Sequence, residues 1–171
     1  MSALFPVDLV HGAEALLAEL KRLGFRLATS ESCTGGLLAG LLTEIAGSSA
    51  VFERGFVTYS NSAKSELIGV PPALLERHGA VSEEVARAMA EGALAHAPVD
   101  VAVSVTGIAG PDGGSLEKPV GLVYLAVASK GAPTLTQERR FGSIGRTQIR
   151  LASVRAATEL ARRAVSAAGR H

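Results

Sequence analysis

The sequence predicts an α/β fold, a single three-layer α/β/α domain with a mixed, mostly parallel sheet. Helical hydrophobic periodicity alternates with short apolar runs along the chain, which is typical of strands covered by helices on both faces. After residue 120 two apolar runs follow one another without a helix between them, which indicates a mixed sheet. The 171 residues suit one domain, so we expect residues 1–171 to form a single unit.

The first part of the chain predicts a helix, a strand and a second helix. Apolar residues recur at three- and four-residue steps over 9–23, and Gly24 follows where a left-handed residue can end the helix. A short apolar run over 25–29 predicts a strand. A tight turn at 34–36 then opens a helix over 37–45.

The middle of the chain predicts one strand and three helices. The strand is expected over 56–59, a short helix over 61–68, and Pro71 marks the start of another. Ser82 begins a further helix, because its hydroxyl can cap free amides while the two glutamates after it favour the positive helix end. We expect that helix to end near Pro98.

The last part of the chain predicts the centre of the sheet and a long final helix. Residues 99–105 form an apolar run with one aspartate, as expected of a strand buried on both faces. They lead into a loop over 106–114 that contains four glycines. Two further strands are expected over 121–128 and 134–141, the second at an edge, and helical spacing resumes over 149–165.

Composition excludes several classes of protein. Hydrophobic residues make up 47% and charged residues 19%, so we expect a buried core rather than a disordered chain. The net charge of +1 lacks the basic footprint of a dedicated nucleic-acid binder. Aromatic residues make up 4% and tryptophan is absent, so side chains that stack on bases are scarce. We therefore expect no direct binding of nucleic acid.

Cysteine and histidine usage argues against metal binding and an oxidising compartment. The single cysteine, Cys33, excludes an internal disulfide and a thiolate cluster built from this chain alone. The four histidines show no spacing typical of metal ligands. We find neither a secretory signal nor an apolar run of about 20 residues that could span a bilayer. We expect a cytoplasmic protein without membrane contact, metal or cofactor.

The segment over 29–36 is the first candidate site. It places hydroxyls, a carboxylate and a thiol at the start of a helix, where free amides and the helix dipole favour a phosphate or an oxyanion. The alternative is structural, with Ser32 or Thr34 capping the helix while Gly35 and Gly36 permit a tight turn. The spacing matches neither a Walker loop nor a dinucleotide-binding fingerprint. Both interpretations stay open.

Tyr59 and Lys64 offer a phenol and an amine at the end of a strand and the first turn of a helix. Lys64 can act as a base if burial or a nearby cation lowers its pKa, and Tyr59 can relay a proton. The alternative is a solvated lysine and a packed tyrosine. A serine with lysine or tyrosine can perform acyl transfer without histidine, which favours the catalytic interpretation. The Cys33 thiol is either a second candidate nucleophile or a small buried side chain.

The loop over 106–114 and the start of the final helix form the other candidate site. Several glycines after a buried strand, among them Gly107 and Gly110, let backbone amides approach a ligand closely, although a wide surface turn is the alternative. Arg146 can clamp a phosphate or be an ordinary surface arginine. Both glycine-rich loops directly follow predicted strands, so we expect them at one site beyond the strand ends.

Taken together, these motifs resemble the C-terminal domain of the competence/damage-inducible protein CinA, a family that also occurs alone as nicotinamide-nucleotide amidase of the PncC type. The matching segments are Ser30 to Gly36, Ile45 to Asn61, Lys64, His78 to Ser82, Thr106 to Gly114 and Lys118 to Gly121. They extend from about Ala28 to Arg146, and no motif position departs from the family's pattern.

The resemblance implies an amidohydrolase domain that converts nicotinamide mononucleotide and water to nicotinate mononucleotide and ammonia in pyridine-nucleotide salvage. The pyrophosphatase activity linked to another domain of longer CinA proteins is not expected. The functional positions that the resemblance implies are Ser32, Ser49, Tyr59, Lys64, Thr106 and Arg146.

The chemistry of amide hydrolysis suggests roles for these positions. An amide needs an activated nucleophile, oxyanion donors and an acid for the leaving ammonia. We expect Ser32 to attack while Lys64, acting with Tyr59, moves the proton, and Ser49 stays open as the other candidate nucleophile. Amides of the Gly35–Gly36 turn or of the Ser49 region are expected to hold the oxyanion. The expected substrate contacts are Thr34, Gly35, Gly36, Ser49, Thr106, Gly107, Gly110 and Arg146.

Two alternatives to a serine amidase stay open. A non-catalytic module that senses a nucleotide or binds a partner in competence or DNA damage is suggested by the family's name. A thiol amidase that uses Cys33 is the alternative within the enzyme class. The small size and apolar composition also predict a symmetric homo-oligomer.

Overall fold

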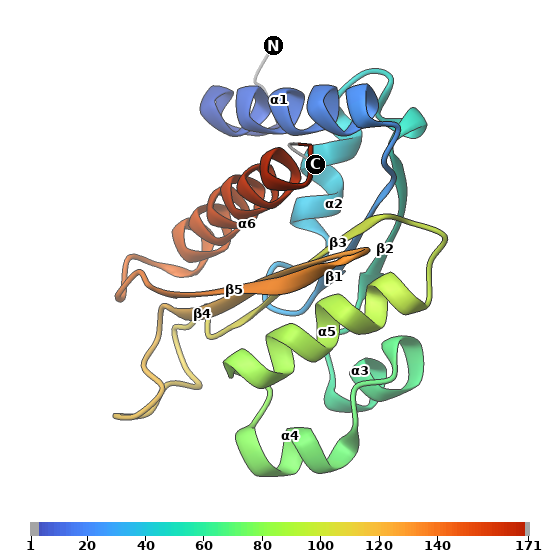
Figure 1. Ribbon diagram of the computed structural model, residues 1–171. Coiled ribbons are helices and arrows are strands. Elements are labelled where there is room, and N and C mark those ends of the chain that lie inside the picture. The colour runs from blue at the N-terminus through green and yellow to red at the C-terminus, as the bar shows by residue number, and fades with distance from the viewer. Residues whose placement is uncertain (1–3, 170–171) are drawn as a thin grey trace.

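A five-stranded mixed sheet forms the centre of the structure, a computed structural model that describes residues 4–169 (Figure 1). The ends of the expected domain, residues 1–3 and 170–171, lie outside the described residues. The strands are β1 (Leu27–Glu31), β2 (Phe52–Val57), β3 (Val101–Gly107), β4 (Leu122–Ser129) and β5 (Ala132–Arg140), in the order β2-β1-β3-β4-β5. β1 pairs in parallel with β2 and β3, whereas β4 runs antiparallel to β3 and β5. The prediction of a mixed sheet is confirmed, since only β4 runs against the other strands.

Helices cover both faces of the sheet, which confirms the α/β/α fold (Figure 1). They are α1 (Val7–Leu23), α2 (Leu37–Glu44), α3 (Asn61–Ile68), α4 (Pro72–His78), α5 (Glu83–Ala95) and α6 (Arg146–Ala168), with a short 3-10 helix at Ser48–Ala50. α2 and α6 lie on one face and α5 on the other, while α1 packs mainly on α6 and α2. Within residues 4–169 we find no helix whose length and hydropathy suit a membrane span.

Hydrophobic clusters of different character join these layers. The larger core, between the sheet and α1, α2 and α6, consists mainly of leucine, valine and alanine side chains. One cluster beneath α5 consists of small residues, with Ala86 and Ala90 of α5 packed against Ala126 and Ala128 of β4, whereas Val85 and Met89 of α5 pack in another. Small side chains let the helix approach the sheet, and Ser104 Oγ donates to the carbonyl oxygen of Ala86 at 2.6 Å. α5 is thereby fixed across the centre of the sheet.

Strand β2 differs most from the sequence prediction. It occupies Phe52–Val57 rather than 56–59, and it is a half-exposed edge strand without a continuous apolar run. Its charged residues Glu53 and Arg54 form an ion pair at 2.9 Å, which a search for apolar runs does not detect. The shift places Tyr59 beyond the strand end rather than within it.

Smaller differences also affect the candidate site. β1 begins two residues later than the predicted 25–29, so that Glu31 ends the strand and Ser32 directly follows it. α6 begins at Arg146 rather than at residue 149. The helix over 61–68, the Ser82 cap of α5 and the edge position of β5 are confirmed.

Candidate active site

The carboxyl ends of β1, β2 and β3 border one pocket of about 280 Å³. Open α/β sheets bind ligands beyond this end of their strands. Among the predicted site residues, those that line the pocket are Ser32, Cys33, Tyr59, Lys64, Thr106, Gly107 and Arg146. Those outside its lining are Thr34, Gly35, Gly36, Ser49 and Gly110.

Lys64 is a buried lysine whose amine contacts Ser32. Its side chain, in the first turn of α3, is only 1% exposed. Nζ donates to Ser32 Oγ at 3.1 Å and to the carbonyl oxygen of Thr58 at 2.8 Å. Removal of the amine from water lowers the pKa of Lys64 from its ordinary 10.5 to about 8.

This contact suits proton transfer. With a pKa of about 8, a fraction of the Lys64 amine is neutral near neutral pH and carries a lone pair. The carbonyl oxygens of Thr58 and Tyr59 lie 2.8 and 3.4 Å from Lys64 Nζ and can accept hydrogen bonds from the two N–H groups of the neutral amine. The lone pair can then accept the Ser32 proton, as in serine–lysine acyl transfer without histidine.

Ser32 is fixed by backbone bonds on both sides. Its N–H donates to the carbonyl oxygen of Val105 in β3 at 2.9 Å, and its own carbonyl oxygen accepts from Gly35 N at 3.0 Å. The turn continues through Gly35 and Gly36 at φ values of +56° and +96°, a left-handed conformation that glycine adopts without strain. The hydroxyl therefore stands at the end of β1 before a tight turn into α2.

Glu31 caps α2, a role that the sequence analysis did not assign. This buried carboxylate accepts from the N–H groups of Gly36, Leu38 and Ala39 at 3.1, 3.0 and 2.8 Å. Because the cap comes from the preceding strand, the hydroxyl of Ser32 is not used for capping. The amide of Gly36 is also occupied, so it is not free for the expected oxyanion role. A carboxylate at a strand end, four residues before the Gly35–Gly36 turn, is the signal that could have indicated this cap.

Tyr59 and Arg146 meet at the mouth of the pocket. Tyr59 is 60% exposed, and its hydroxyl accepts from Arg146 Nη2 at 3.2 Å. Arg146 Nη1 donates to the carbonyl oxygen of Gly110 at 2.8 Å. The phenol thus contacts Arg146, and it is the main-chain carbonyl of Tyr59 that contacts Lys64. Gly110 serves through its carbonyl, as an anchor for Arg146.

Thr106 and Gly107 close the pocket at the end of β3. Thr106 is buried, and its hydroxyl donates to the carbonyl oxygen of Ala80 at 2.8 Å. A Cβ on Gly107 would lie 2.6 Å from Val123 Cγ2 and 2.9 Å from the carbonyl oxygen of Leu122, so only glycine fits beside β4. The Thr106 hydroxyl ties the strand end to the loop before α5.

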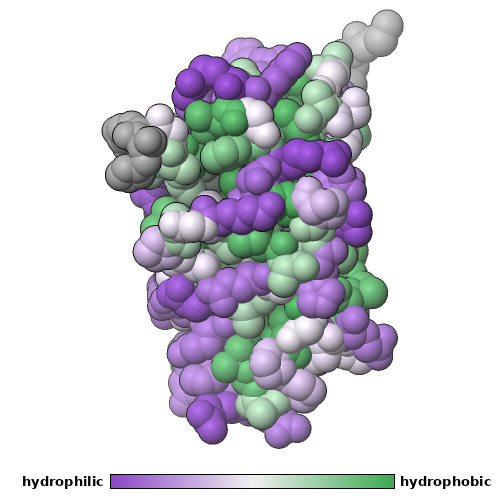
Figure 2. Space-filling model, turned by 45° about the vertical axis from the view of Figure 1, so that its right-hand side comes forward, coloured by the Kyte–Doolittle hydropathy of each residue, from purple (hydrophilic) through white to green (hydrophobic). Residues whose placement is uncertain are grey.

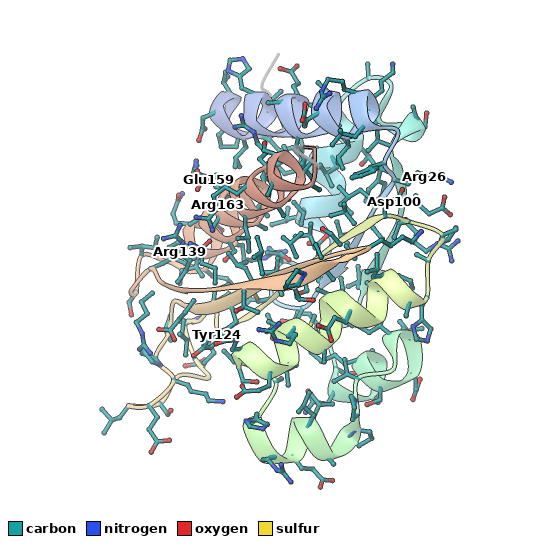
Figure 3. The ribbon with its side chains drawn as sticks, viewed as in Figure 1. Arg26, Asp100, Tyr124, Arg139, Glu159 and Arg163 are labelled. Atoms are coloured by element: carbon teal, nitrogen blue, oxygen red, sulfur yellow. The ribbon has the colours of Figure 1, made fainter. Side chains whose placement is uncertain are left out.

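Ser49 lies at the opposite end of the sheet. It is exposed on the 3-10 helix that precedes β2, next to the amino end of β1, where Leu27 N donates to the carbonyl oxygen of Val51 at 2.9 Å. Figure 3 labels Arg26 and Asp100, which precede β1 and β3 at this same end. The length of β1, about 16 Å at ~3.3 Å per residue, separates Ser49 from the pocket of its own chain.

The Cys33 thiol is a poor candidate nucleophile. It is buried in the larger core, and burial raises the pKa of Cys33 to about 12. The thiol therefore stays protonated near neutral pH.

The pocket also contains residues that the sequence analysis did not single out. They are Ala80, Val81, Ile108, Ala109, Asp112 and Gly113. All belong to two of the segments that carry the family resemblance, which was the available signal. Asp112 adds a carboxylate to a lining that already holds Lys64 and Arg146. Among the described residues, no three His, Cys, Asp or Glu side chains are placed to share a metal ion.

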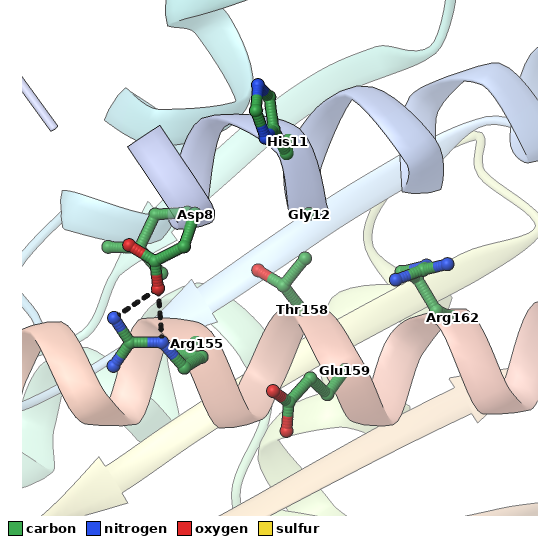
Figure 4. A pocket seen from close by; sticks show the side chains of 8 residues that line it. Asp8, His11, Gly12, Arg155, Thr158, Glu159 and Arg162 are labelled. Carbon is green, nitrogen blue, oxygen red and sulfur yellow. Dashed lines mark hydrogen bonds and ion pairs between the residues drawn. The ribbon is translucent and has the colours of Figure 1, made fainter. Parts of the chain in front are cut away.

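Other hollows lie along α6. One of about 360 Å³ lies between α1 and α6, where Arg155 Nε donates to Asp8 at 2.8 Å (Figure 4). Two neighbouring hollows share Arg139 and Glu159, which lie on the α6 side of the molecule (Figure 3). On the face shown in Figure 2, hydrophilic residues separate the hydrophobic ones into patches. Within the described residues, these hollows contain no contact comparable to that between Lys64 and Ser32.

Comparison with known proteins assigns the family. The model of the CinA C-terminal domain matches residues 11–165, most of the chain. The chain belongs to the CinA C-terminal domain family. The resemblance inferred from the motifs is thereby confirmed, and the matched region contains the whole pocket lining.

Curated relatives of this CinA C-terminal domain include enzymes of similar length. It is 59% identical over 124 residues to the nicotinamide-nucleotide amidohydrolase PncC of Enterobacter agglomerans, a match that covers 72% of this chain and 76% of the relative. It is 54% identical over 134 residues to the protein of the same name from Escherichia coli strain K12, with 78% and 81% covered. A CinA-like protein of Geobacter is 57% identical over 129 residues, 75% of this chain but only 31% of that longer protein.

Solved structures share the fold of this CinA C-terminal domain. A competence/damage inducible protein from Agrobacterium tumefaciens has 53% identity and a TM-score of 0.93, with 96% of this chain and 99% of that chain covered. A CinA superfamily protein from Escherichia coli has 36% identity and a TM-score of 0.85, with 93% and 92% covered.

Proposed function

We propose that this CinA C-terminal domain is a nicotinamide mononucleotide amidohydrolase, which produces nicotinate mononucleotide and ammonia. The observation that carries the proposal is the buried contact between Lys64 Nζ and Ser32 Oγ, 3.1 Å apart in a pocket at the carboxyl end of the sheet. The printed names of the relatives that are 54% and 59% identical support this substrate.

Acylation is the first half of the proposed reaction. Ser32 Oγ attacks the carboxamide carbon, its proton passes to Lys64 Nζ, and the carbonyl electron pair moves onto the oxygen. The tetrahedral intermediate collapses when the C–N bond breaks. Lys64 returns the proton to the leaving nitrogen, so that ammonia departs and an ester on Ser32 remains.

Deacylation repeats these steps with water. The oxygen of a water molecule attacks the ester carbon while Lys64 takes a proton from that water. Lys64 then protonates Ser32 Oγ as the ester C–O bond breaks. The product is the nicotinate carboxylic acid, which loses its proton to solvent. The same amine thus acts as base and acid in both halves, which requires a pKa near the working pH.

The charges around the pocket suit a pyridinium nucleotide. The contacts of Arg146 in the structure are a carbonyl and a hydroxyl, which leave its charge to attract a phosphate. Asp112 lines the same pocket, and its negative charge can attract a cationic ring. Arg146→Ala is therefore expected to raise KM more than it lowers kcat.

The test is ammonia release from nicotinamide mononucleotide by purified protein in the presence of a chelator. We expect activity in the wild type and its loss in Ser32→Ala and Lys64→Ala. Exposed residues of the same types provide matched controls, Ser166→Ala and Lys21→Ala, which are expected to keep wild-type turnover.

Two outcomes would contradict the proposal. Nucleotide binding without ammonia release would favour the non-catalytic sensing module. Full activity of Ser32→Ala together with an inactive Ser49→Ala would assign the nucleophile to the other serine.

A further inference from the structure

One guanidinium from α6 holds the turn that follows Ser32. Arg150 Nε donates to the carbonyl oxygen of Cys33 at 3.1 Å, and Nη2 donates to that of Thr34 at 3.0 Å. The two carbonyls belong to successive peptide units, and the planar fork of the guanidinium binds both. A Cβ on Gly35 would lie 3.5 Å from Nη2, so the guanidinium rests against the turn itself.

The N–H groups of this turn differ in whether they donate a hydrogen bond. The N–H groups of Gly35 and Gly36 already donate within the turn and to the α2 cap. Within residues 4–169, the structure gives the N–H groups of Cys33 and Thr34 no acceptor. Of these two residues, Cys33 lines the pocket beside Ser32, whereas Thr34 is fully buried outside the lining.

We propose that Arg150 is a positioning residue, which holds the turn so that the amide of Cys33 donates to the oxyanion formed when Ser32 attacks the carboxamide. This inference rests on the proposed amidohydrolase function. The amide after a nucleophilic serine has this role in other strand–turn–helix sites. Donors that are fixed before the reaction stabilise the transition state most effectively, because they need no reorganisation.

Arg150 and Arg146 have different tasks in this account. They are four residues apart, on neighbouring turns of one face of α6. Arg146 reaches the pocket mouth, whereas the side-chain hydrogen bonds of Arg150 within residues 4–169 go to the backbone of the turn. Loss of Arg146 should therefore act on KM, and loss of Arg150 on kcat.

The test measures kcat, KM and Tm for Arg150→Met and Arg150→Lys, with nicotinamide mononucleotide as substrate. Arg163→Met, which changes an exposed arginine of the same helix, is the matched control and is expected to resemble the wild type. We expect kcat of Arg150→Met to fall about 10²- to 10³-fold, while KM stays within about threefold. Guanidinium ion, below the concentration that unfolds the protein, should restore part of this activity but none in Ser32→Ala.

The outcomes separate this inference from the proposed function. A wild-type kcat in folded Arg150→Met would overturn the role of Arg150 and leave the proposed function intact. A loss of kcat that only follows the fall in Tm, and that guanidinium ion does not relieve, would overturn this role as well. If Arg150→Met does not fold, Arg150→Lys decides, because an ammonium lacks the planar fork that binds the two carbonyls in the structure, and a wild-type kcat there would overturn the role. A wild type that releases no ammonia would overturn the proposed function and this inference with it.

Discussion

The pKa of Lys64 links the stability of the fold to pH. In the unfolded chain the amine titrates near 10.5, and in the fold it titrates near 8. Between these pH values the unfolded state binds more protons, so the free energy of unfolding should rise as pH rises. At about 1.4 kcal/mol per pKa unit, the rise is about 3 kcal/mol.

Urea unfolding at pH 8 and pH 10 measures this effect. Lys64→Met is the reference, because it removes the titrating amine and leaves all other groups that titrate in this range. We expect the free energy of unfolding to rise more in the wild type than in Lys64→Met. The same pH dependence in both proteins would show that the amine is not buried as described.

The protonated thiol of Cys33 gives a second prediction at this scale. Since burial raises the pKa of Cys33 to about 12, we expect no catalytic task for the thiol, and Cys33→Ala should keep the wild-type kcat. Ammonia release by this variant, before and after treatment with a thiol alkylator, checks the prediction. Loss of turnover in a variant that keeps its Tm would revive the thiol amidase.

At the scale of elements, α2 depends on a cap that comes from β1. Glu31→Ala would leave the N–H groups of Gly36, Leu38 and Ala39 without their shared acceptor. We expect a loss of about 2–4 kcal/mol in the free energy of unfolding. Glu44→Ala changes an exposed glutamate at the other end of α2 and should cost less than about 0.5 kcal/mol. Equal losses in urea unfolding would contradict the capping role.

The elements differ in how well the sequence predicts them. Long amphipathic helices and the buried strand β3 follow from hydrophobic periodicity, because each has an apolar face or an apolar run. β2 does not, since it is a half-exposed edge strand that carries Glu53 and Arg54. The α2 cap was missed for a related reason. Its carboxylate stands five residues before the first amide that it binds, outside the usual capping position.

At the scale of the molecule, the pocket joins residues that lie far apart in the chain. Ser32, Lys64, Thr106 and Arg146 come from strand ends and helix starts, and the sheet topology brings them to one pocket. Their chemistry and rough location could be predicted from loops that follow strands. Their contacts could not, because the direction of the Tyr59 hydroxyl depends on where β2 ends. The placement of Ser49 likewise depends on where β2 begins, because Ser49 lies on the 3-10 helix that precedes this strand.

The expectation of a homo-oligomer stays a prediction at this scale. Sedimentation of the purified chain over a range of concentrations tests it, and we expect a species heavier than 17.5 kDa. A single species of monomer mass at every concentration would contradict it.

Trapping of the ester on Ser32 tests the central claim most directly. Hydroxylamine added during turnover of nicotinamide mononucleotide should intercept the acyl-enzyme and yield the hydroxamate of the nicotinate nucleotide. The account predicts this product with the wild type and none with Ser32→Ala. Ammonia release by the wild type without hydroxamate at any hydroxylamine concentration would contradict a serine-bound intermediate.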